Sequence, residues 1–239
     1  MKTICLWSGP RNVSTALMYS FAQRVDTQVI DEPLYGHYLR VSGAQHPGRN
    51  EVMASMSCDG GAVMTALLER SPAEPADILF LKQMAHHLVD IDTQFLDRTG
   101  NILLIRDPAE MLQSLTIQLP HAGLADSGLA MQWQLYLELV AKGQQPAIVD
   151  SRELRLDPAG ILSRLCHALD IEFDAAMLSW PAGRRKEDGI WEKYWYQSVH
   201  ESTGFAPYEA KPPCPETLHN LLDECQPYYD LLFAHALRA

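Results

Sequence analysis

The fold is decided by the stretch Ile4-Cys5-Leu6-Trp7-Ser8-Gly9-Pro10-Arg11-Asn12-Val13-Ser14-Thr15. Its first four residues are apolar and suit a short buried strand, which Gly9 and Pro10 cannot continue. Residues 14–22 then carry apolar side chains at helical spacing. The order strand, tight loop, helix brings free backbone N–H groups and the positive end of a helix to one point. This arrangement predicts a loop that holds a phosphate-bearing nucleotide.

The rest of the chain alternates short apolar runs with helical patterns. Strands are expected near residues 29–30, 78–82, 101–106 and 147–150, and helices at 61–71, 84–95, 108–117, 130–142, 158–169 and 215–239. Asp107-Pro108 and Asp157-Pro158 each match a helix start, with Asp as N-cap and Pro at the first helical position. The alternation predicts one α/β domain over residues 1–239, a P-loop-like parallel sheet of about five strands flanked by helices. Ligands of such sheets bind at the carboxyl ends of the strands.

Composition limits the classes of partner. The 239 residues carry a net charge of −11, which argues against an extended nucleic-acid-binding face. Five cysteines without a C-x-x-C pair indicate neither a disulfide framework nor a zinc site. The chain has no signal-peptide pattern and no apolar run long enough to cross a membrane. We therefore expect a cytoplasmic protein that binds neither nucleic acid nor membrane.

The first chemical motif is the loop of residues 9–15, called the phosphate loop below. Arg11 offers a bidentate guanidinium to phosphate or sulfate oxygens, and Ser14 and Thr15 add hydroxyl donors. The loop is not a Walker A motif, because no Lys precedes Ser14 or Thr15. No acidic partner for magnesium is evident, so no metal is expected.

Two further motifs carry basic residues. Arg106 stands at the end of the clearest strand, and Ser114 lies about two helical turns beyond it, so both could reach a second phosphate. Residues 183–191 form the densest basic run of an acidic chain, with glycines at 183 and 189. Taken alone, Arg106 could equally form a surface ion pair, and residues 183–191 a solvated linker.

Together these motifs resemble those of sulfotransferases, and most closely the sulfotransferase-like P-loop proteins of the type joined to branched-chain-aminotransferase-like proteins. Residues 31–35, 188–191 and 194–196 strengthen the likeness, which spans residues 3–205. The resemblance implies 3′-phosphoadenosine 5′-phosphosulfate as co-substrate and no metal. The donor-binding residues that it implies are Gly9, Pro10, Arg11, Asn12, Val13, Ser14, Thr15, Arg106, Ser114, Arg185, Lys186 and Gly189.

The chain also departs from the family pattern. Arg11 replaces the usual loop lysine, as it does in the tyrosylprotein type. The C-terminal R-K-G-x-x-G-x-W motif is one residue shorter, with Glu187 where its first glycine would stand. The K-T-H segment of the cytosolic enzymes, whose His is catalytic, reads Lys82-Gln83-Met84.

Sulfuryl transfer needs a base for the acceptor and a positive group for the leaving phosphate. Arg11, with Ser14, suits the second role. Glu32 is the first choice as base, because it follows the second strand beside the phosphate loop, as the base does in the tyrosylprotein and bacterial types. His86 and His87 are its main rivals, and His37 is a third.

The acceptor pocket is expected from residues 33–60 and 119–135. Its candidate lining residues are Tyr35, His37, Tyr38, His46, Arg49 and Trp133. Many small hydroxylated or aminated molecules would suit these side chains. The chain is expected to be a monomer or a weak homodimer.

Two other functions remain open from the residues. A nucleotide kinase or other P-loop phosphotransferase shares the fold, although the missing Walker lysine and magnesium ligand argue against it. A non-catalytic nucleotide-binding module is the second alternative, because the phosphate loop and the C-terminal motif are both altered.

Overall fold

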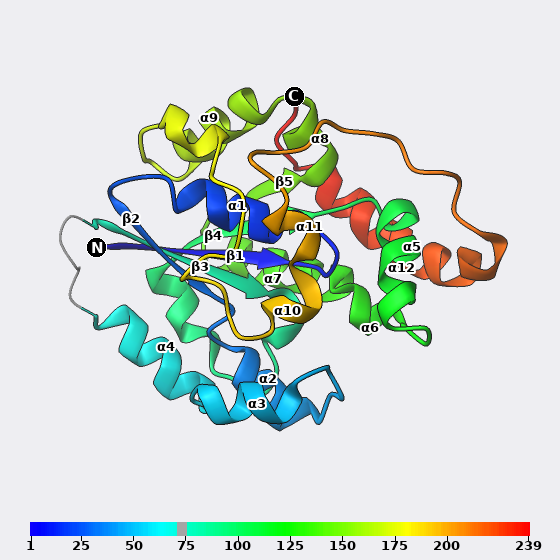
Figure 1. Ribbon diagram of the computed structural model, residues 1–239, viewed down its shortest axis with the longest axis horizontal. Coiled ribbons are helices and arrows are strands. Elements are labelled where there is room, and N and C mark those ends of the chain that lie inside the picture. The colour runs from blue at the N-terminus through cyan, green and yellow to red at the C-terminus, as the bar shows by residue number, and fades with distance from the viewer. Residues whose placement is uncertain (71–75) are drawn as a thin grey trace.

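The computed structural model describes residues 1–70 and 76–239 (Figure 1). Its single sheet has five parallel strands in the order β2-β3-β1-β4-β5. The strands are β1 (Lys2–Ser8), β2 (Thr27–Asp31), β3 (Ile78–Met84), β4 (Gly100–Ile105) and β5 (Ala147–Asp150). The predicted α/β class and five-strand parallel sheet are confirmed.

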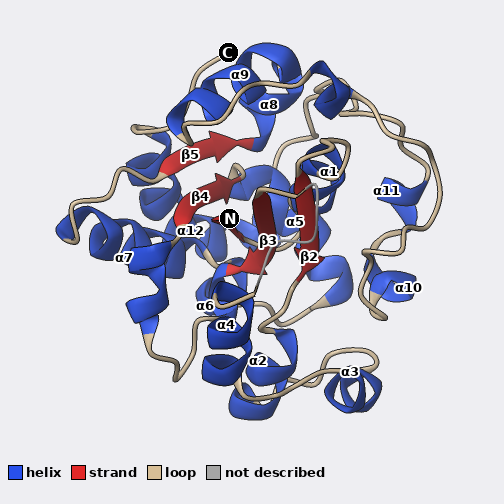
Figure 2. Ribbon diagram, turned by 90° about the vertical axis from the view of Figure 1, so that its left-hand side faces the viewer, coloured by secondary structure: helices blue, strands red, loops and turns tan. Residues whose placement is uncertain are grey.

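Helices cover both faces of the sheet, and the strands show why (Figure 2). Alternate residues of β1 point to opposite faces, yet Ile4, Cys5, Leu6 and Trp7 are all fully buried. Ile4 and Leu6 belong to one core cluster, and Cys5 and Trp7 belong to the other. The first cluster includes residues of α1 (Ser14–Phe21) and α9 (Pro158–Ala168), and the second includes residues of α4 (Gly60–Leu68), α5 (Pro108–Gln118), α7 (Leu129–Ala141) and α12 (His219–Phe233).

Short helices complete the chain. They are α2 (Tyr35–Ser42), α3 (Arg49–Ser55), α6 (Leu124–Ser127), α8 (Ser151–Leu156), α10 (Glu192–Trp195) and α11 (Gln197–His200), with 3₁₀ turns η1 (Ala85–His87), η2 (Thr93–Arg98), η3 (Ala175–Leu178) and η4 (Glu216–Leu218). A third, smaller core cluster packs α2 and α3 against Trp191 and Tyr196. Residues 35–55 and 191–196 are therefore held together beside the sheet.

Most expected helix starts agree with the structure. The Asp107 carboxylate accepts from the Ala109 N–H, and the Asp157 carboxylate accepts from the Gly160 N–H, so both predicted N-caps are confirmed. The helix expected at 61–71 is α4, which ends at Leu68, and residue 71 lies outside the described residues. In the described ranges, no helix combines the length and apolar character that a membrane span requires.

The helix expected at 84–95 is wrong. Strand β3 continues to Met84 beside Ser8, and the chain then forms the 3₁₀ turns η1 and η2. The polar pair Lys82-Gln83 resembles a strand end, but both side chains are buried within the sheet because the fold supplies partners for the Lys82 charge. Helix α8 was not expected, although Asp150 caps it through the N–H groups of Arg152 and Glu153.

The core between α1 and β3 provides a test of the packing. Phe21 and Phe80 are fully buried and stack with ring centroids 4.1 Å apart. Phe80→Ala should lower the free energy of unfolding by about 3–5 kcal/mol, because it removes apolar contacts and leaves a cavity. Urea denaturation measures this change. Val25→Ala, at a position 81% exposed, is the control and should change stability by less than about 0.5 kcal/mol.

Candidate active site

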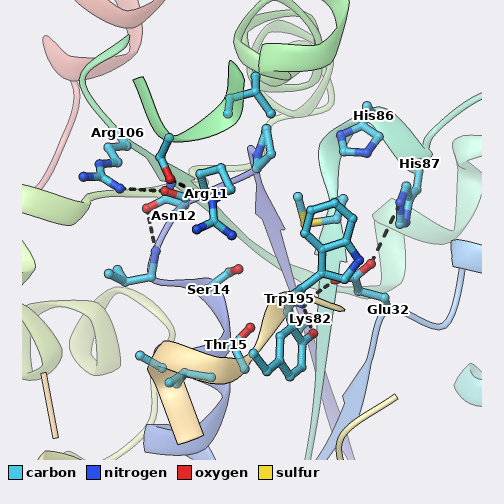
Figure 3. Close-up of a pocket in the computed structure, with 18 of the residues that line it drawn as sticks. Arg11, Asn12, Ser14, Thr15, Glu32, Lys82, His86, His87, Arg106 and Trp195 are labelled. Atoms are coloured by element: carbon cyan, nitrogen blue, oxygen red, sulfur yellow. Dashed lines mark hydrogen bonds and ion pairs between the residues drawn. The ribbon is translucent and has the colours of Figure 1, made fainter. Parts of the chain in front are cut away.

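A cavity of about 710 Å³ lies at the carboxyl edge of the sheet (Figure 3). The phosphate loop after β1, Glu32 after β2, Lys82 near the end of β3 and Arg106 after β4 all line it. Arg155 of α8, which follows β5, also reaches it. Every strand of the sheet therefore delivers polar groups to one cavity, as expected for parallel strands.

Helix α1 begins at this cavity without a side-chain cap. Its N-cap is Val13, which offers no acceptor to the first-turn N–H groups. By contrast, aspartates cap α5 after β4 and α8 after β5. A carboxylate at the start of α1 would satisfy those N–H groups and repel an anion, whereas valine leaves them and the positive helix end available. The start of α1 is therefore suited to bind phosphate or sulfate oxygens.

Arg11 and Arg106 share this end of the cavity. Arg11 Nε donates to Ser114 Oγ at 2.9 Å, and Arg106 Nη1 donates to the Arg11 carbonyl oxygen at 2.7 Å. Burial and the nearby Arg106 guanidinium lower the pKa of Arg11. Two neighbouring guanidinium groups repel each other until an anion lies between them. Glu110 pairs with Arg106 at 3.3 Å.

Asn12 and Gly9 fix the shape of the phosphate loop. Asn12 Nδ2 donates to the Leu104 carbonyl of β4, while its Oδ1 accepts from the Val13 N–H. Gly9 does not line the main cavity, and a Cβ there would come 2.7 Å from the Ser127 carbonyl oxygen. The glycine is therefore needed for close packing.

A buried group of charges lies beside the loop, at the ends of β2 and β3. The Lys82 ammonium is hydrogen-bonded to Asp31, 3.0 Å away, and to Glu32. The Tyr196 hydroxyl donates to Asp31 at 2.7 Å and accepts from Lys82 at 2.7 Å. Lys82, Asp31 and Tyr196 are nearly inaccessible to solvent, and only Glu32 of the two carboxylates lines the cavity.

The charge balance in this group determines its proton affinity. Burial raises the pKa of Glu32, and the Asp31 carboxylate adds to the rise, while Lys82 opposes it. Burial alone would lower the pKa of Lys82, but the two carboxylates outweigh burial and raise it well above the ordinary value. One ammonium thus serves two carboxylates, and Glu32 is the carboxylate that can exchange a proton with the cavity.

Two cavity residues have an unusual backbone. Four described non-glycine residues have positive φ: Arg11 (51°), Glu32 (40°), Asp90 and Asp170. Aspartate tolerates this conformation, but for arginine and glutamate it costs about 1–3 kcal/mol each. Such strain gathers at functional sites, and here it occurs at the proposed anion ligand and the proposed base.

The basic residues of 183–191 do not line the cavity, although Trp191 does. Arg185 lies over the Tyr19 ring, and the Lys186 side chain is 91% exposed beside Glu187. Asp188 accepts from the Arg185 N–H and the Tyr19 hydroxyl, so Arg185 packs against α1 while Lys186 extends into solvent. The structure therefore does not bring Arg185 and Lys186 to the phosphate loop.

Gly189 has a packing role instead. Its N–H donates to Asp31 Oδ2 at 3.1 Å. A Cβ at this position would come 2.1 Å from Trp191 Cζ2, so only glycine allows the Trp191 ring to lie here. The Trp191 Nε1–H then donates to the Tyr196 hydroxyl, which joins this segment to the buried charges.

The opposite end of the cavity is aromatic. Its rings belong to Tyr35, Tyr38, His46, His86, His87, Trp191 and Trp195. His37 is not among the lining residues, because it holds the Val89 carbonyl and the Gly60 N–H. Arg49 and Trp133 also lie elsewhere: Arg49 donates to the Leu39 carbonyl, and Trp133 stacks on Tyr136.

Sequence reasoning missed several parts of the site. The motifs mark Lys82 only as the first residue of the altered K-T-H segment, and its link to Asp31 and Tyr196 could not be read from the chain. No motif marks several other residues that line the cavity, namely Arg155, Ser198, Val199, Ser202, Gly204, Phe205 and Ala206. In the described ranges, no three His, Cys, Asp or Glu side chains are grouped as metal ligands would be.

The fold and the loop define a P-loop-like α/β protein. Residues 1–236 match the family model described as "Sulfotransferase domain". The chain therefore belongs to the sulfotransferase family of transferase enzymes, which confirms the resemblance noted from its motifs.

Two longer relatives match almost the whole of this chain. The chain is 39% identical over 231 residues to branched-chain-amino-acid aminotransferase-like protein 1 of Arabidopsis thaliana, covering 96% of this chain and 41% of that protein. Protein 2 of the same name is 37% identical, with 98% and 42% covered. This chain thus spans about two fifths of the length of these relatives.

Solved sulfotransferase structures share the fold. The sulfotransferase from Alicyclobacillus acidocaldarius has a TM-score of 0.56 at 12% identity, covering 99% of this chain and 98% of its own. The sulfotransferase domain of a Synechococcus olefin synthase has a TM-score of 0.54 at 18% identity, covering 99% and 96%.

The Lys82 ammonium can be tested through stability. Lys82→Met should lower the free energy of unfolding by about 3–5 kcal/mol at neutral pH, because it leaves Asp31 and Glu32 buried without a cation. Carboxyl groups whose folded pKa is raised hold extra protons in the native state, so the loss should grow as pH rises from about 4.

Urea denaturation at pH 5 and pH 8 measures both effects. Lys142→Met is the matched control, since it breaks a lysine pair with the 54% exposed Asp97 and should cost less than about 1 kcal/mol. If Lys82→Met lowers the free energy of unfolding equally at the two pH values, the ammonium of Lys82 does not neutralise the buried carboxylates.

Proposed function

We propose that the chain transfers a sulfuryl group from 3′-phosphoadenosine 5′-phosphosulfate to a hydroxyl or amine of a small acceptor. One observation carries the proposal: a single cavity joins an uncapped helix start with two arginines to a buried carboxylate. The first part suits the anionic donor, and the second suits removal of a proton from the acceptor.

The residues present fit such a donor. The first-turn N–H groups of α1, with the Ser14 and Thr15 hydroxyls, are available to one phosphosulfate group. Arg11, fixed by Ser114, adds a guanidinium at the same end, and Arg106 is held beside it. Bound here, the donor would supply the sulfuryl group and a phosphate leaving group.

The chain's own groups act on the two ends of the transfer. The Glu32 carboxylate takes the proton of the acceptor hydroxyl while the acceptor oxygen forms the new bond to sulfur. The bond between sulfur and the phosphate oxygen breaks, and the released charge falls on the phosphate. Arg11 and the N–H groups at the start of α1 are fixed where that charge develops, so they need little reorganisation.

Glu32 is a better base than either histidine. Burial lowers the pKa of His86 to about 3, and burial likewise lowers the pKa of His87. A base works best when its pKa is near the working pH. Burial shifts the pKa of each histidine away from neutral pH, whereas it shifts the pKa of Glu32 upward, toward neutral pH. The histidines are neutral and accept a proton reluctantly.

Donor binding can be measured by thermal shift. Near 100 times its Kd, 3′,5′-adenosine bisphosphate should raise the melting temperature by about 5–10 °C, because it binds only the native state. Arg11→Ala and Arg106→Ala should each remove most of the shift, while Arg98→Ala, at an exposed position outside the cavity, should retain it. An equal shift with magnesium-ATP would favour a phosphotransferase instead.

The base can be separated from binding. Glu32→Gln should keep the thermal shift yet lower kcat roughly 100- to 10,000-fold, because it removes the proton acceptor without changing shape. Release of the bisphosphate product with an acceptor panel measures turnover. Wild-type activity should fall as the pH drops through the raised pKa of Glu32, above the ordinary value of about 4.3.

The exposed Glu69→Gln serves as the matched control for Glu32→Gln and should retain full turnover. If Glu32→Gln turns over at the wild-type rate, Glu32 is not the base. If the wild type releases no product with any acceptor while binding the bisphosphate, the chain is a binding module.

A further inference from the structure

The Tyr196 hydroxyl has every hydrogen-bonding position in use. It donates to Asp31 Oδ2 at 2.7 Å, and it accepts from Lys82 Nζ at 2.7 Å and from Trp191 Nε1 at 3.2 Å. A tyrosine hydroxyl offers one hydrogen and accepts through its lone pairs, so these contacts fix its orientation. Burial raises the pKa of Tyr196 well above the ordinary value, and the hydroxyl therefore keeps its proton. Tyr196 orients its neighbours and is not a base for the acceptor.

Three partners direct the Lys82 ammonium. Its three N–H groups match three acceptors, namely Asp31 Oδ1 at 3.0 Å, Glu32 Oε1 and the Tyr196 hydroxyl. A lysine side chain is flexible and its charge is compact, so the ammonium keeps facing Glu32 only while its other two N–H groups are held. Asp31 is the neighbour of Glu32 in β2, whereas Tyr196 lies 114 residues beyond Lys82. Tyr196 is thus the partner that comes from outside the sheet.

One carboxylate oxygen of this group remains for an acceptor. Both oxygens of Asp31 accept hydrogen bonds, from Lys82 and from Tyr196. Glu32 Oε1 accepts from Lys82. Among the described residues, Glu32 Oε2 accepts no hydrogen bond, and His87 Nε2 lies 4.0 Å from it, beyond hydrogen-bonding distance (Figure 3). Because Glu32 lines the cavity, its Oε2 is the atom that can take a proton there.

The charges beside Glu32 are those of Lys82 and Asp31. Two further titratable groups face its carboxylate, the Tyr35 hydroxyl of α2 and the His87 imidazole of η1. Burial raises the pKa of Tyr35 and lowers the pKa of His87, so both groups stay neutral. The proton affinity of Glu32 therefore depends on how the two carboxylates share one ammonium.

The Tyr196 hydroxyl governs that sharing. Without it, Asp31 has one donor fewer and Lys82 has one acceptor fewer, so the ammonium is drawn toward Asp31. Glu32 then keeps less of the positive charge that opposes its protonation. Its Oε1 also loses a fixed partner, although its backbone N–H still donates to the Lys82 carbonyl at 2.8 Å.

We infer that Tyr196 is a positioning residue for the proposed base, because its hydroxyl keeps Lys82 directed at Glu32 Oε1 and leaves Glu32 Oε2 to the acceptor. The inference rests on the proposed function and adds to it a residue that acts through Lys82. Loss of the hydroxyl should therefore reach the reaction through the protonation of Glu32.

The test uses Tyr196→Phe, which keeps the ring and removes only the hydroxyl. In the free protein, ¹³C NMR of labelled glutamate follows the titration of Glu32, whose Cδ signal is identified by its loss in Glu32→Gln. The midpoint should lie at higher pH in Tyr196→Phe than in the wild type, because Lys82 opposes protonation of Glu32 less. This measurement needs neither donor nor acceptor.

Turnover should change in the same direction. With benzyl alcohol, phenol and benzylamine as acceptors, Tyr196→Phe should lower kcat roughly 10- to 100-fold, because a displaced catalytic group costs about that much. KM should stay within about twofold, and the thermal shift with 3′,5′-adenosine bisphosphate should be unchanged, because the phosphate loop is intact. The acid limb of the kcat profile should move to higher pH, since less carboxylate is present at each acidic pH.

Tyr229→Phe is the matched control. Tyr229 is as buried as Tyr196, 6% against 5% exposed, and its hydroxyl donates to the buried Asp150 at 3.1 Å outside the cavity. The control therefore removes a buried tyrosine–aspartate hydrogen bond of the same kind and should lower stability comparably. Its Glu32 midpoint, kcat and pH profile should match those of the wild type.

The outcomes separate this inference from the proposed function. An unchanged Glu32 midpoint in folded Tyr196→Phe, or an equal fall of kcat in Tyr229→Phe, overturns the inference. If the midpoint moves as expected but no protein releases the bisphosphate with any acceptor, the positioning of Glu32 stands and the transferase proposal fails. If Tyr196→Phe turns over at the wild-type rate with the wild-type acid limb, the transferase proposal stands and the inference fails.

Discussion

The Lys82 ammonium, buried between Asp31 and Glu32, is the interaction on which the site depends. Strands β2 and β3 pair so that Asp31 lies beside Lys82, and the lysine then reaches the glutamate that follows. Without this cation, two carboxylates would be forced into a buried space and would take up protons. The same cluster binds Tyr196, so it also fixes residues 189–196 against the sheet edge. The buried charges therefore hold Glu32, the cavity wall at residues 189–196 and the edge of the sheet in fixed positions relative to one another.

The fold was largely readable from the chain. Apolar runs such as 101–106 and the Asp-Pro pairs at 107–108 and 157–158 act through local physics, namely burial and capping, and they marked strands and helices correctly. The error at 84–95 arose where tertiary structure overrides local pattern. Lys82 looks like a solvent-facing residue at a strand end, yet distant partners, Asp31 and Tyr196, allow it to be buried within β3.

The site was readable only in part. The phosphate loop can be predicted from the sequence, because its strand, loop and helix are contiguous. The direction of a side chain in a long connection depends on tertiary contacts, so the neighbouring residues in the sequence do not predict it. Arg185 and Lys186 form the most obvious basic run, yet neither lines the cavity, because Arg185 packs over the Tyr19 ring and Lys186 extends into solvent. Conversely, Arg155 reaches the cavity from an unremarkable helix.

The three hydrogen bonds that Asp31 accepts have an evolutionary consequence. One carboxylate accepts from the Lys82 and Tyr196 side chains and from the Gly189 N–H, so replacing Lys82 or Tyr196 alone leaves a buried polar group without a partner. Positions 31, 82 and 196 are therefore coupled in evolution, and a tolerated change must alter several of them together. A descendant that lost the lysine would survive most easily by losing the aspartate in the same lineage.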